Sequence, residues 1–353
     1  MVAALVSAPV HSANAVQARL EALQANRDDV PGFALALIEN GSVTSAATGE
    51  ASPDGALMTA QTPFRLASVT KTFVAAALLR LSETGRLDLD SPIERLISSK
   101  HSAILRADGY EPEDITVRHL LMHSAGLADH FASEEGIAVA FANPQRLWTR
   151  TQQLALMTRL TDPLGKPGEA FSYSDTGYIL LGEIIEMVTG EPLAEAVRSL
   201  NSFQALGIAS LRWEALIGEE PAPVRAHQYF QGADIFDWNG SLDAFGGGGL
   251  IGNVEDTARY FDALFSGKIF AAPETLELMM SAPGHPKGSP YRLGLFVREV
   301  GGHDVYSHGG FWGVQALHVP SLNLTIVCVA LAEEGERAVT ALAYDLIEER
   351  AAP

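Results

Sequence analysis

The pattern of apolar residues is most continuous over residues 64–81, and this stretch predicts a central helix. From Ser68 onward it is rich in alanine and leucine and contains no glycine or proline, which favours the α-helix. Apolar side chains occupy nearly every side, as in a helix that is buried all round. Ser68 and Lys71 are the polar exceptions, and their three-residue spacing places them on one face, one turn apart.

Both ends of the chain predict strands of an antiparallel sheet. Near the start, residues 31–38 and 42–48 flank the turn signal Glu39-Asn-Gly41, which is typical of a β-hairpin. The last third alternates as a meander. Its strands are expected over residues 291–299, 304–307, 313–319 and 322–331, and helices over 15–24 and 334–349 would pack on the sheet.

The middle of the chain predicts helices and long loops. Helices are expected over residues 115–123, 149–160, 176–188 and 254–265, with a short helix that has Ser91 as N-cap and Pro92 at its first position. Residues 205–245 predict long loops with short strands. The glycine run 246–249 lacks the lysine of a phosphate-binding loop, so we interpret it as a turn that permits close backbone approach.

Together these elements predict an α+β fold, in which the N-terminal hairpin and the C-terminal meander share one antiparallel sheet flanked by helices. We expect a sheet domain built from two segments, residues 1–66 and 270–353. A mostly helical inserted domain would span residues 67–269 and carry loops that line a site.

Composition narrows the class of partner. The formal net charge of −19 would repel nucleic acids and anionic membranes. No run approaches the roughly 20 apolar residues of a membrane span. The single cysteine, Cys328, lies in an apolar run, so no intrachain disulfide can form and core packing is expected.

The N-terminus leaves the cellular compartment open. Residues 2–10 are mildly apolar, and residues 13–15 resemble a signal-peptidase site. However, no lysine or arginine precedes Arg19, whereas a signal peptide normally begins with a basic region. A weak export signal and an ordinary chain start both fit, and we prefer a periplasmic or secreted location over a cytoplasmic one.

Ser68 and Lys71 form a candidate nucleophile and base. A buried lysine is desolvated, which favours its neutral form. A serine in the first helical turn also faces free N–H groups and the positive end of the helix dipole. A hydroxyl beside a base is an activated nucleophile. Because a Ser-x-x-Lys match arises roughly once by chance in a chain of this length, a purely structural role is the alternative.

The remaining histidines and serines do not point to other chemistry. His119 and His123 are four residues apart, but no glutamate follows the first, so packing and capping explain them better than a metal site. The chain contains no Gly-x-Ser-x-Gly, the motif of the α/β-hydrolase nucleophile. We therefore expect neither a metal nor an organic cofactor.

Three motifs in order resemble those of the serine β-lactamase and penicillin-binding protein superfamily: Ser68-x-x-Lys71, Tyr173-x-Asp175 and His308-Gly309-Gly310. The chain is most similar to the class C β-lactamase branch. This branch also holds D-stereospecific aminopeptidases and amidases, DD-carboxypeptidases and family VIII carboxylesterases. The resemblance covers roughly residues 15–350 and implies an active site where the two expected domains meet.

The resemblance implies a reaction through an acyl-enzyme. Ser68 would attack a carbonyl carbon, with Lys71 and Tyr173 as the base system, and Tyr173 would pass the proton to the leaving group. The ammonium is expected to lower the pKa of Tyr173. The N–H groups of Ser68 and Phe311 would hold the oxyanion, and losing such a donor typically costs ~3–4 kcal/mol.

Asp175 departs from the family pattern, which more often has asparagine. An amide can donate to the carbonyl of an acylamino substrate, whereas an ionised carboxylate cannot. Asp175 would also favour a protonated Lys71 and shift the base role toward Tyr173. We therefore expect substrates with a free amine, or plain esters. Capping of the helix over 176–188 is the alternative role of Asp175.

His308 stands where β-lactamases carry lysine. Its charge is expected to titrate near neutral pH, and the hydroxyl that follows the family lysine is replaced by Gly309. This change points away from obligatory recognition of a substrate carboxylate. Phe311, Trp312 and Trp238 suggest an aromatic-walled substrate pocket or, alternatively, core packing.

We predict a serine hydrolase that acts on a small-molecule or short-peptide substrate. Carboxylesterase or D-amino-acid-type aminopeptidase/amidase activity fits best. A DD-carboxypeptidase or weak β-lactamase with the same site is the first alternative, and a catalytically silent β-lactamase-like binding protein is the second. Transfer of the acyl group to an acceptor other than water also stays open, as does the oligomeric state.

Overall fold

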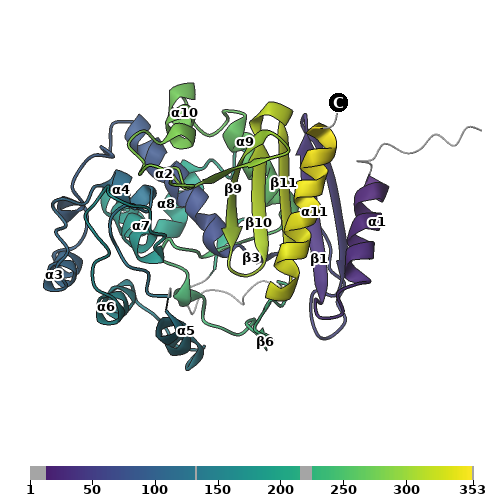
Figure 1. Cartoon of the computed structure of the whole chain (residues 1–353), viewed down its shortest axis with the longest axis horizontal. Helices are drawn as coiled ribbons and strands as arrows, with labels where there is room; N and C mark the ends of the chain where they lie inside the picture. Colours follow the sequence, from purple (N-terminus) through teal and green to yellow (C-terminus); the bar gives the residue numbers. More distant parts are fainter. Residues whose placement is uncertain (1–12, 132, 215–224, 352–353) are drawn as a thin grey trace, which may run out of the picture.

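The computed structural model describes residues 13–131, 133–214 and 225–351 and contains a six-stranded antiparallel sheet beside a group of helices (Figure 1). The strand order is β2-β1-β11-β10-β9-β8. The hairpin of β1 (Gly32–Glu39) and β2 (Ser42–Gly49) therefore pairs with the last strand, β11 (Leu324–Ala330). The predicted α+β fold with a shared sheet is confirmed, whereas the candidate export signal over residues 2–10 lies outside the described residues.

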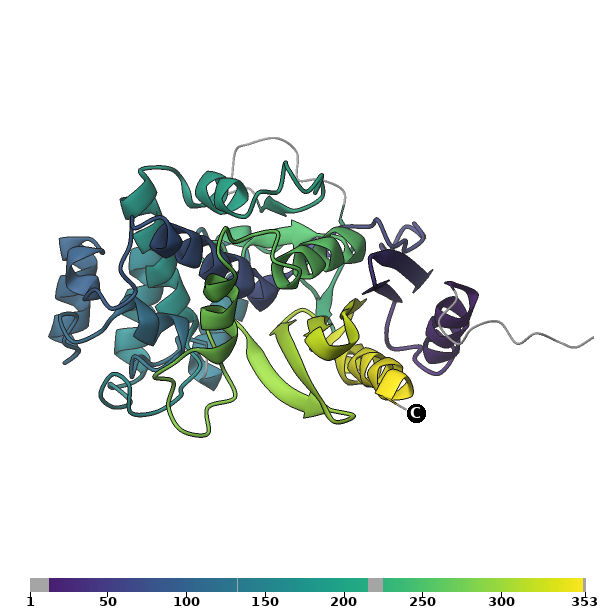
Figure 2. The ribbon, with the colours of Figure 1, turned by 90° about the horizontal axis from the view of Figure 1, so that it is seen from above.

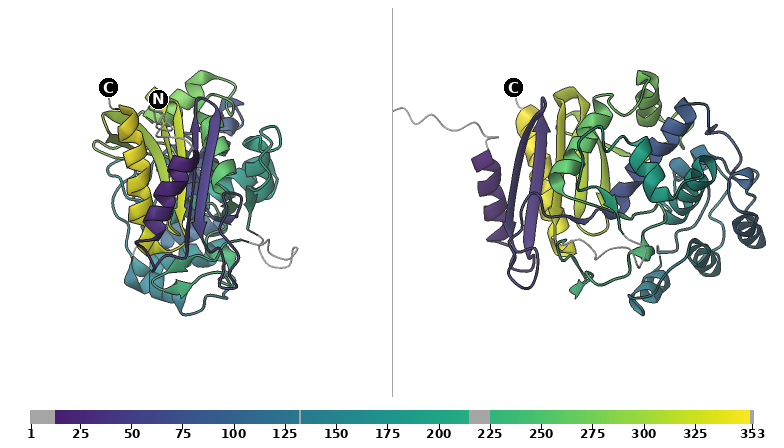
Figure 3. Two further views of the ribbon diagram at one scale, coloured as in Figure 1. Left: turned by 90° about the vertical axis from the view of Figure 1, so that its right-hand side faces the viewer. Right: turned by 180° about the vertical axis from the view of Figure 1, so that it is seen from behind.

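The sheet is covered on both faces, and the alternation along β1 shows how. Phe33, Leu35 and Leu37 belong to one apolar cluster with α1 (Ala13–Gln24) and α11 (Glu333–Ala351). The intervening residues Ala34, Ala36 and Ile38 belong to a second cluster with α9 (Val254–Phe265). Figures 2 and 3 show α1 and α11 on one side of the sheet and α9 on the other. Because side chains alternate along a strand, a continuous apolar run serves both faces.

The meander is completed by β8 (Phe296–Val300), β9 (His303–Gly310) and β10 (Val314–Val319). The first of these strands was expected from residue 291, and this boundary is wrong. Gly294 has φ +79°, and the Arg292 N–H donates to the carbonyl of Leu295, so the chain turns before β8 begins. The turn packs against Ala75 of the central helix. Cys328 is fully buried in the core, as expected.

The helical part surrounds α2 (Thr70–Glu83), in which nearly every residue up to Leu81 is buried. Around it lie α3 (Ser99–Ala107), α4 (Val117–Leu121), α5 (Glu134–Phe141), α6 (Arg150–Leu160), α7 (Asp175–Thr189), α8 (Leu193–Leu200) and α10 (Pro273–Ser281). Two small sheets complete the fold: β3 (Phe64–Arg65), β7 (Leu250–Gly252) and β4 (Arg212–Trp213), and the pair β5 (Tyr229–Phe230) and β6 (Ala233–Asp234).

Two predicted helices differ from the structure. The helix expected over residues 115–123 is only the short α4, because Thr116 caps its start and His123 adopts a left-handed conformation with φ +52°. Pro92 lies before a 3₁₀ turn, Ile93–Arg95, rather than at the first helical position, since its extended backbone pairs with Thr116. The division into domains at residues 66 and 270 stays a prediction, although α9 of the expected helical domain packs on the sheet.

No helix within the described ranges is long and apolar enough to cross a membrane.

Candidate active site

The nucleophile candidate lies where the helical part meets the sheet. Ser68 belongs to a 3₁₀ turn, Ala67–Val69, that leads into α2, so the α-helix begins two residues later than the sequence predicted. Ala67 has φ +45°, a left-handed conformation that costs a non-glycine residue roughly 1–3 kcal/mol. The end of β9 packs on this turn, and a Cβ atom at Gly310 would collide with the Leu66 carbonyl oxygen. Glycine at position 310 thus allows the strand to approach Ser68.

The Lys71 ammonium is fully buried and lies among acceptors. It donates to the Ser68 hydroxyl oxygen at 2.8 Å and to the Gly247 carbonyl oxygen at 2.5 Å. It also forms an ion pair with Asp175, at 2.5 Å between Nζ and Oδ1. The glycine run, interpreted from sequence as a close-approach turn, therefore supplies a carbonyl to the buried lysine.

The expectation of a neutral Lys71 is wrong for this arrangement. Burial alone would lower the pKa of Lys71, but the charge of Asp175 and the neighbouring Tyr173 hydroxyl more than compensate and raise the pKa of Lys71 above its ordinary value. Lys71 is therefore an ammonium at neutral pH. The companion expectation, that Asp175 favours a protonated Lys71, is confirmed.

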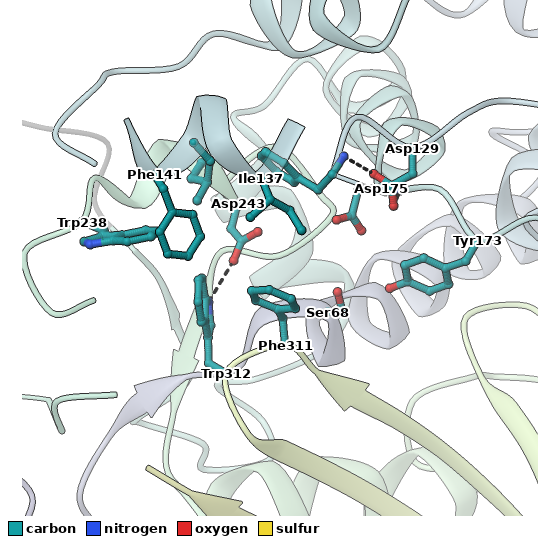
Figure 4. Close-up of a pocket in the computed structure, with 13 residues that line it drawn as sticks. Ser68, Asp129, Ile137, Phe141, Tyr173, Asp175, Trp238, Asp243, Phe311 and Trp312 are labelled. Carbon is teal, nitrogen blue, oxygen red and sulfur yellow. Dashed lines mark hydrogen bonds between the residues drawn. The ribbon is translucent and has the colours of Figure 1, made fainter. Parts of the chain in front are cut away.

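Tyr173 completes the polar cluster. Ser68 and Lys71 both act on its hydroxyl and favour its ionised form, and Figure 4 shows the Tyr173 hydroxyl directed toward Ser68. The expected lowering of its pKa is not observed. Burial, with a contribution from Asp175, outweighs the effect of Lys71 and raises the pKa of Tyr173 to about 12. In the free protein Tyr173 is therefore a neutral phenol.

Asp175 is the first residue of α7, but it does not cap the helix. Ser174 is the N-cap, because its hydroxyl accepts the N–H of Gly177. The carboxylate of Asp175 instead faces Lys71 and the cavity beside Ser68. The alternative of simple capping is thus wrong. Gly247 passes so close that an added Cβ would contact the Asp175 carboxylate at 3.5 Å.

His308 reaches the site, but its charge does not titrate near neutral pH. Nδ1 donates to the Gly309 carbonyl oxygen at 2.8 Å, and Nε2 accepts from the Tyr291 hydroxyl at 2.9 Å. Burial, reinforced by the Lys71 ammonium, lowers the pKa of His308 to about 3. The expectation of a titratable cation in place of the family lysine is therefore wrong, because both ring nitrogens are engaged inside the protein.

The three aromatic residues singled out from sequence line a cavity of about 170 Å³ beside Ser68 (Figure 4). Phe311 is 48% exposed, whereas Trp312 is 4% exposed and packs edge-to-face on Trp238, with ring centroids 6.1 Å apart. The aromatic pocket wall is thus present, and Trp312 is also part of a small core cluster. Phe131, Ile137 and Phe141 also line the cavity, and the ring of Phe141 packs edge-to-face on Trp238 with centroids 4.6 Å apart.

On the other side of Ser68 a more polar groove runs along β9. Its lining includes Gly309, Gly310, Arg298 and Glu333. Ser68 therefore borders both a mostly apolar cavity and a groove of mixed polarity. Phe311 follows Gly310 directly in the chain. The role of its backbone N–H as an oxyanion donor stays a prediction.

Two carboxyl groups of the cavity escaped the sequence analysis. Asp129 is 11% exposed, and burial together with the nearby Asp175 raises its pKa to about 7. Asp243 accepts a hydrogen bond from Trp312 Nε1 at 3.2 Å, and burial raises its pKa to about 6. No local pattern marks either residue, since each lies in a loop and meets Asp175 only through the fold.

A buried ion network binds the loop that carries Trp238, one of the residues that line the cavity. Arg65 pairs with Glu214 at 2.8 Å and donates to the carbonyl oxygens of Ile235 and Trp238. Arg225 also contacts Glu214, at 3.2 Å. These side chains are nearly inaccessible to solvent, and through Arg65 they connect the loop that carries Trp238 to β3.

The described residues hold no cluster of three or more His, Cys, Asp or Glu side chains that would suit a metal ion. The cluster that is present, a hydroxyl, an ammonium and a phenol within mutual reach, suits proton transfer to and from a serine.

This antiparallel sheet with its group of helices is the β-lactamase fold. The chain belongs to the beta-lactamase family, whose model matches residues 14–349.

Similar proteins include an esterase and a penicillin-binding protein. Esterase EstB of Burkholderia gladioli is 31% identical over 250 residues, which cover 63% of this chain and 62% of the esterase. Penicillin-binding protein 4 of Amycolatopsis lactamdurans is 29% identical over 228 residues, which cover 59% of this chain and 55% of that protein. The chain therefore spans less than two thirds of the length of these relatives.

Solved structures agree over a larger share. A D-stereospecific amidohydrolase from Streptomyces sp. is 26% identical with a TM-score of 0.77, covering 91% of this chain and 95% of its own. The D-amino acid amidase from Ochrobactrum anthropi SV3 is 25% identical with a TM-score of 0.78, covering 96% and 98%.

Proposed function

We propose that this serine hydrolase cleaves esters or amides whose acyl part carries a free amine and a bulky apolar side chain, as in derivatives of D-amino acids. The observation that carries the proposal is the set of three carboxyl groups, Asp129, Asp175 and Asp243, around the apolar cavity beside Ser68. Lys71 forms an ion pair with Asp175, and the charges of Lys71 and Arg65 also act on Asp243. A substrate ammonium would compensate the remaining acidic groups, and the aromatic walls would take the side chain.

The raised pKa values of Asp129 and Asp243 support this proposal. A carboxyl group that is buried without its own cation holds its proton more tightly. An ammonium entering the cavity would reverse this effect and favour both carboxylates. An N-acylated substrate would instead present an uncharged carbonyl to acidic groups that cannot all donate to it. The names of the amidohydrolase and the amidase among the similar structures point in the same direction.

The proposed chemistry uses the proton-transfer cluster. Once substrate binding has let Tyr173 release its own proton to water, Ser68 Oγ forms a bond to the substrate carbonyl carbon while its proton passes to the Tyr173 phenolate. The carbonyl oxygen becomes an oxyanion held by the N–H groups of Ser68 and Phe311. The bond to the leaving group then breaks, and the leaving group takes the proton. Water repeats the sequence on the acyl-enzyme and releases the acid.

Substrate binding would prepare the base. Lys71 and Tyr173 are both protonated in the free protein, so one of them must lose a proton before Ser68 can give its own away. A substrate ammonium beside Asp175 would weaken the hold of that carboxylate on Lys71 and lower the pKa values of Lys71 and Tyr173 together. Plain esters would lack this assistance and react more slowly.

A substrate panel tests the proposal. Wild type and Ser68→Ala would be assayed with D- and L-phenylalanine p-nitroanilides, the matched 3-phenylpropanoyl p-nitroanilide without the amine, p-nitrophenyl esters, nitrocefin and a D-Ala-D-Ala peptide. We expect the D-aminoacyl compound to have the highest kcat/KM and Ser68→Ala to abolish turnover. Preference for the amine-free anilide would overturn amine recognition. Labelling of Ser68 by a fluorophosphonate without turnover of any substrate would favour the silent binding protein.

A further inference from the structure

The segment that carries Tyr173 is held by one residue, His123, from both sides. The backbone carbonyl of His123 accepts the N–H of Ser172 at 2.8 Å. Its ring nitrogen Nδ1 accepts the N–H of Ser174 at 3.1 Å. The two residues that flank Tyr173 are thus bound to the same histidine. These two contacts restrict movement of the Tyr173 backbone relative to His123.

The backbone of His123 is adapted to this double contact. It follows the short helix α4 and has φ +52°, a conformation that is unfavourable for most residues but is tolerated best by asparagine, aspartate and histidine after glycine. The adjacent Ser124 carbonyl accepts the N–H of Gly168 at 2.7 Å, which continues the same pairing. A left-handed residue at this point turns both the carbonyl and the ring toward the loop.

The ring of His123 also forms the wall behind the phenol. Its centroid lies 4.2 Å from the ring of Tyr173, 4.5 Å from Tyr291 and 4.9 Å from Tyr178. Because Nδ1 accepts the N–H of Ser174, the ring proton is on Nε2. The ring is buried, and its ionised form would face the Lys71 ammonium and lie near His308, so it stays neutral.

We propose that His123 is a positioning residue for Tyr173: its carbonyl and its Nδ1 atom clamp the loop on both sides of the phenol and keep the Tyr173 hydroxyl directed at Ser68. The inference rests on the proposed function in one respect, namely that Tyr173 carries the proton. It does not depend on the substrate class. His123 itself exchanges no proton in the reaction.

Two substitutions separate clamping from packing. His123→Asn keeps an acceptor, since Asn Oδ1 occupies nearly the position of His Nδ1, and it tolerates the left-handed backbone but removes the ring wall. His123→Phe keeps a ring of similar size but has no acceptor and is disfavoured at φ +52°. If the hydrogen bonds of His123 to the loop position Tyr173, His123→Phe will lower activity more. If the ring contact with Tyr173 positions it, His123→Asn will lower activity more.

The measurement is the second-order rate of fluorophosphonate labelling at Ser68, together with kcat and KM for p-nitrophenyl butyrate. A misplaced catalytic group can cost up to about 10²-fold, so we expect His123→Phe to lower kcat and the labelling rate by roughly 10–100-fold with little change in KM. His123→Asn should stay within a few-fold of wild type and keep its pH profile. The opposite ranking of the two variants would overturn the proposal, and loss of all activity in His123→Asn would point to proton transfer by His123 instead.

A double-mutant cycle with Tyr173→Phe isolates the coupling. If His123 acts through Tyr173, then His123→Phe has no further effect in the Tyr173→Phe background. A full additional loss there would contradict the proposal. If Tyr173→Phe alone leaves the labelling rate unchanged, Tyr173 does not carry the proton and the proposed function is contradicted at that step. If Tyr173→Phe lowers the rate while His123→Phe does not, only the positioning role of His123 is contradicted. Should His123→Phe not fold, His123→Leu replaces it, since leucine is smaller and also lacks an acceptor.

Discussion

The Lys71 ammonium lies 2.5 Å from the Asp175 carboxylate, and this buried ion pair sets the protonation state in which the site rests. Burial lowers the pKa of Lys71, while the charge of Asp175 and the hydroxyl of Tyr173 raise it above the ordinary value. Asp175 therefore keeps Lys71 protonated in the free protein.

Replacing Asp175 by asparagine should shift the pH dependence of the reaction. Without the carboxylate charge, burial dominates, the pKa of Lys71 falls and the neutral amine becomes populated at lower pH. We expect the acid limb of the kcat/KM profile to move to lower pH by at least about one pH unit, as is typical when a close opposite charge is removed. A limb that stays in place in Asp175→Asn would show that Lys71 does not lose its proton before the rate-limiting step.

The same variant tests the selectivity assigned to Asp175. An amide at this position can donate to the carbonyl of an acylamino side chain. Asp175→Asn should therefore raise penicillin turnover relative to turnover of p-nitrophenyl butyrate. An equal change for both substrates would remove the selective role and leave Asp175 with its effect on Lys71 alone.

The two buried acids of the cavity should matter only for amine-bearing substrates. We expect Asp129→Asn and Asp243→Asn to raise KM for D-phenylalanine p-nitroanilide by about tenfold each, the value of one charge-assisted contact, and to leave the amine-free analogue unchanged. Asp237→Asn, which changes an exposed carboxylate on the nearby loop, is the matched control. If all three variants affect both substrates alike, the cavity does not recognise an ammonium.

The Arg65–Glu214–Arg225 network should contribute strongly to stability. Glu214→Gln leaves two buried guanidinium groups without their carboxylate, and breaking such a pair costs about 3–5 kcal/mol of the free energy of unfolding. Urea unfolding measures it. Glu135→Gln breaks the exposed pair with Arg159, at 3.9 Å, and should cost less than about 1 kcal/mol. Comparable losses in the two variants would mean that Glu214 is replaceable by solvent.

Acid should destabilise the fold through its buried histidines, and His318 allows a clean test away from the active site. It stacks on Phe265 at 4.2 Å, and burial lowers its pKa from 6.5 to about 3. Below pH 6.5, His318 therefore binds a proton in the unfolded chain but stays neutral in the folded chain. The contribution of this one group to the free energy of unfolding is fully present above pH 6.5. It is lost as the pH falls, by about 1.4 kcal/mol per pH unit.

His318→Gln should flatten the dependence of the unfolding free energy on pH between 6 and 4 by that contribution. The acids Asp129 and Asp243 act in the opposite sense, because their raised pKa values favour the folded state at low pH. They are present in both proteins, so the difference between the two slopes isolates His318. Parallel slopes for wild type and His318→Gln would contradict the assignment.

The strongly patterned elements were predictable from sequence. The helix α2, the hairpin of β1 and β2, and the strand β11 carry long apolar runs with clear turn signals, and each lies within a few residues of its expected place. The strand β8 was placed too early, because Tyr291 and Leu293 are apolar residues of a turn whose packing against α2 is a tertiary property.

The site was predictable in its membership but not in its protonation. The resemblance brought Ser68, Lys71 and Tyr173 together, yet the pKa values of Lys71 and Tyr173 depend on burial and on the distance to Asp175, which no local pattern encodes. The prediction that His308 titrates near neutral pH was wrong for the same reason, since Tyr291 and the Gly309 carbonyl engage its ring nitrogens. Asp243 was missed because its loop shows no periodicity.

The pairing of β1 with β11 has a consequence for how activity arises during synthesis. The strands that pack on the turn of Ser68, β9 and β10, leave the ribosome long after α2, whose sides are apolar and require partners. The strand β11, which joins them to β1, follows later still. Closing so long a loop is slow, and the nascent chain must keep that helix from aggregating in the meantime. A chain released before β11 would therefore contain its nucleophile and most of its helices but no finished site, so incomplete products of this protein should be inert.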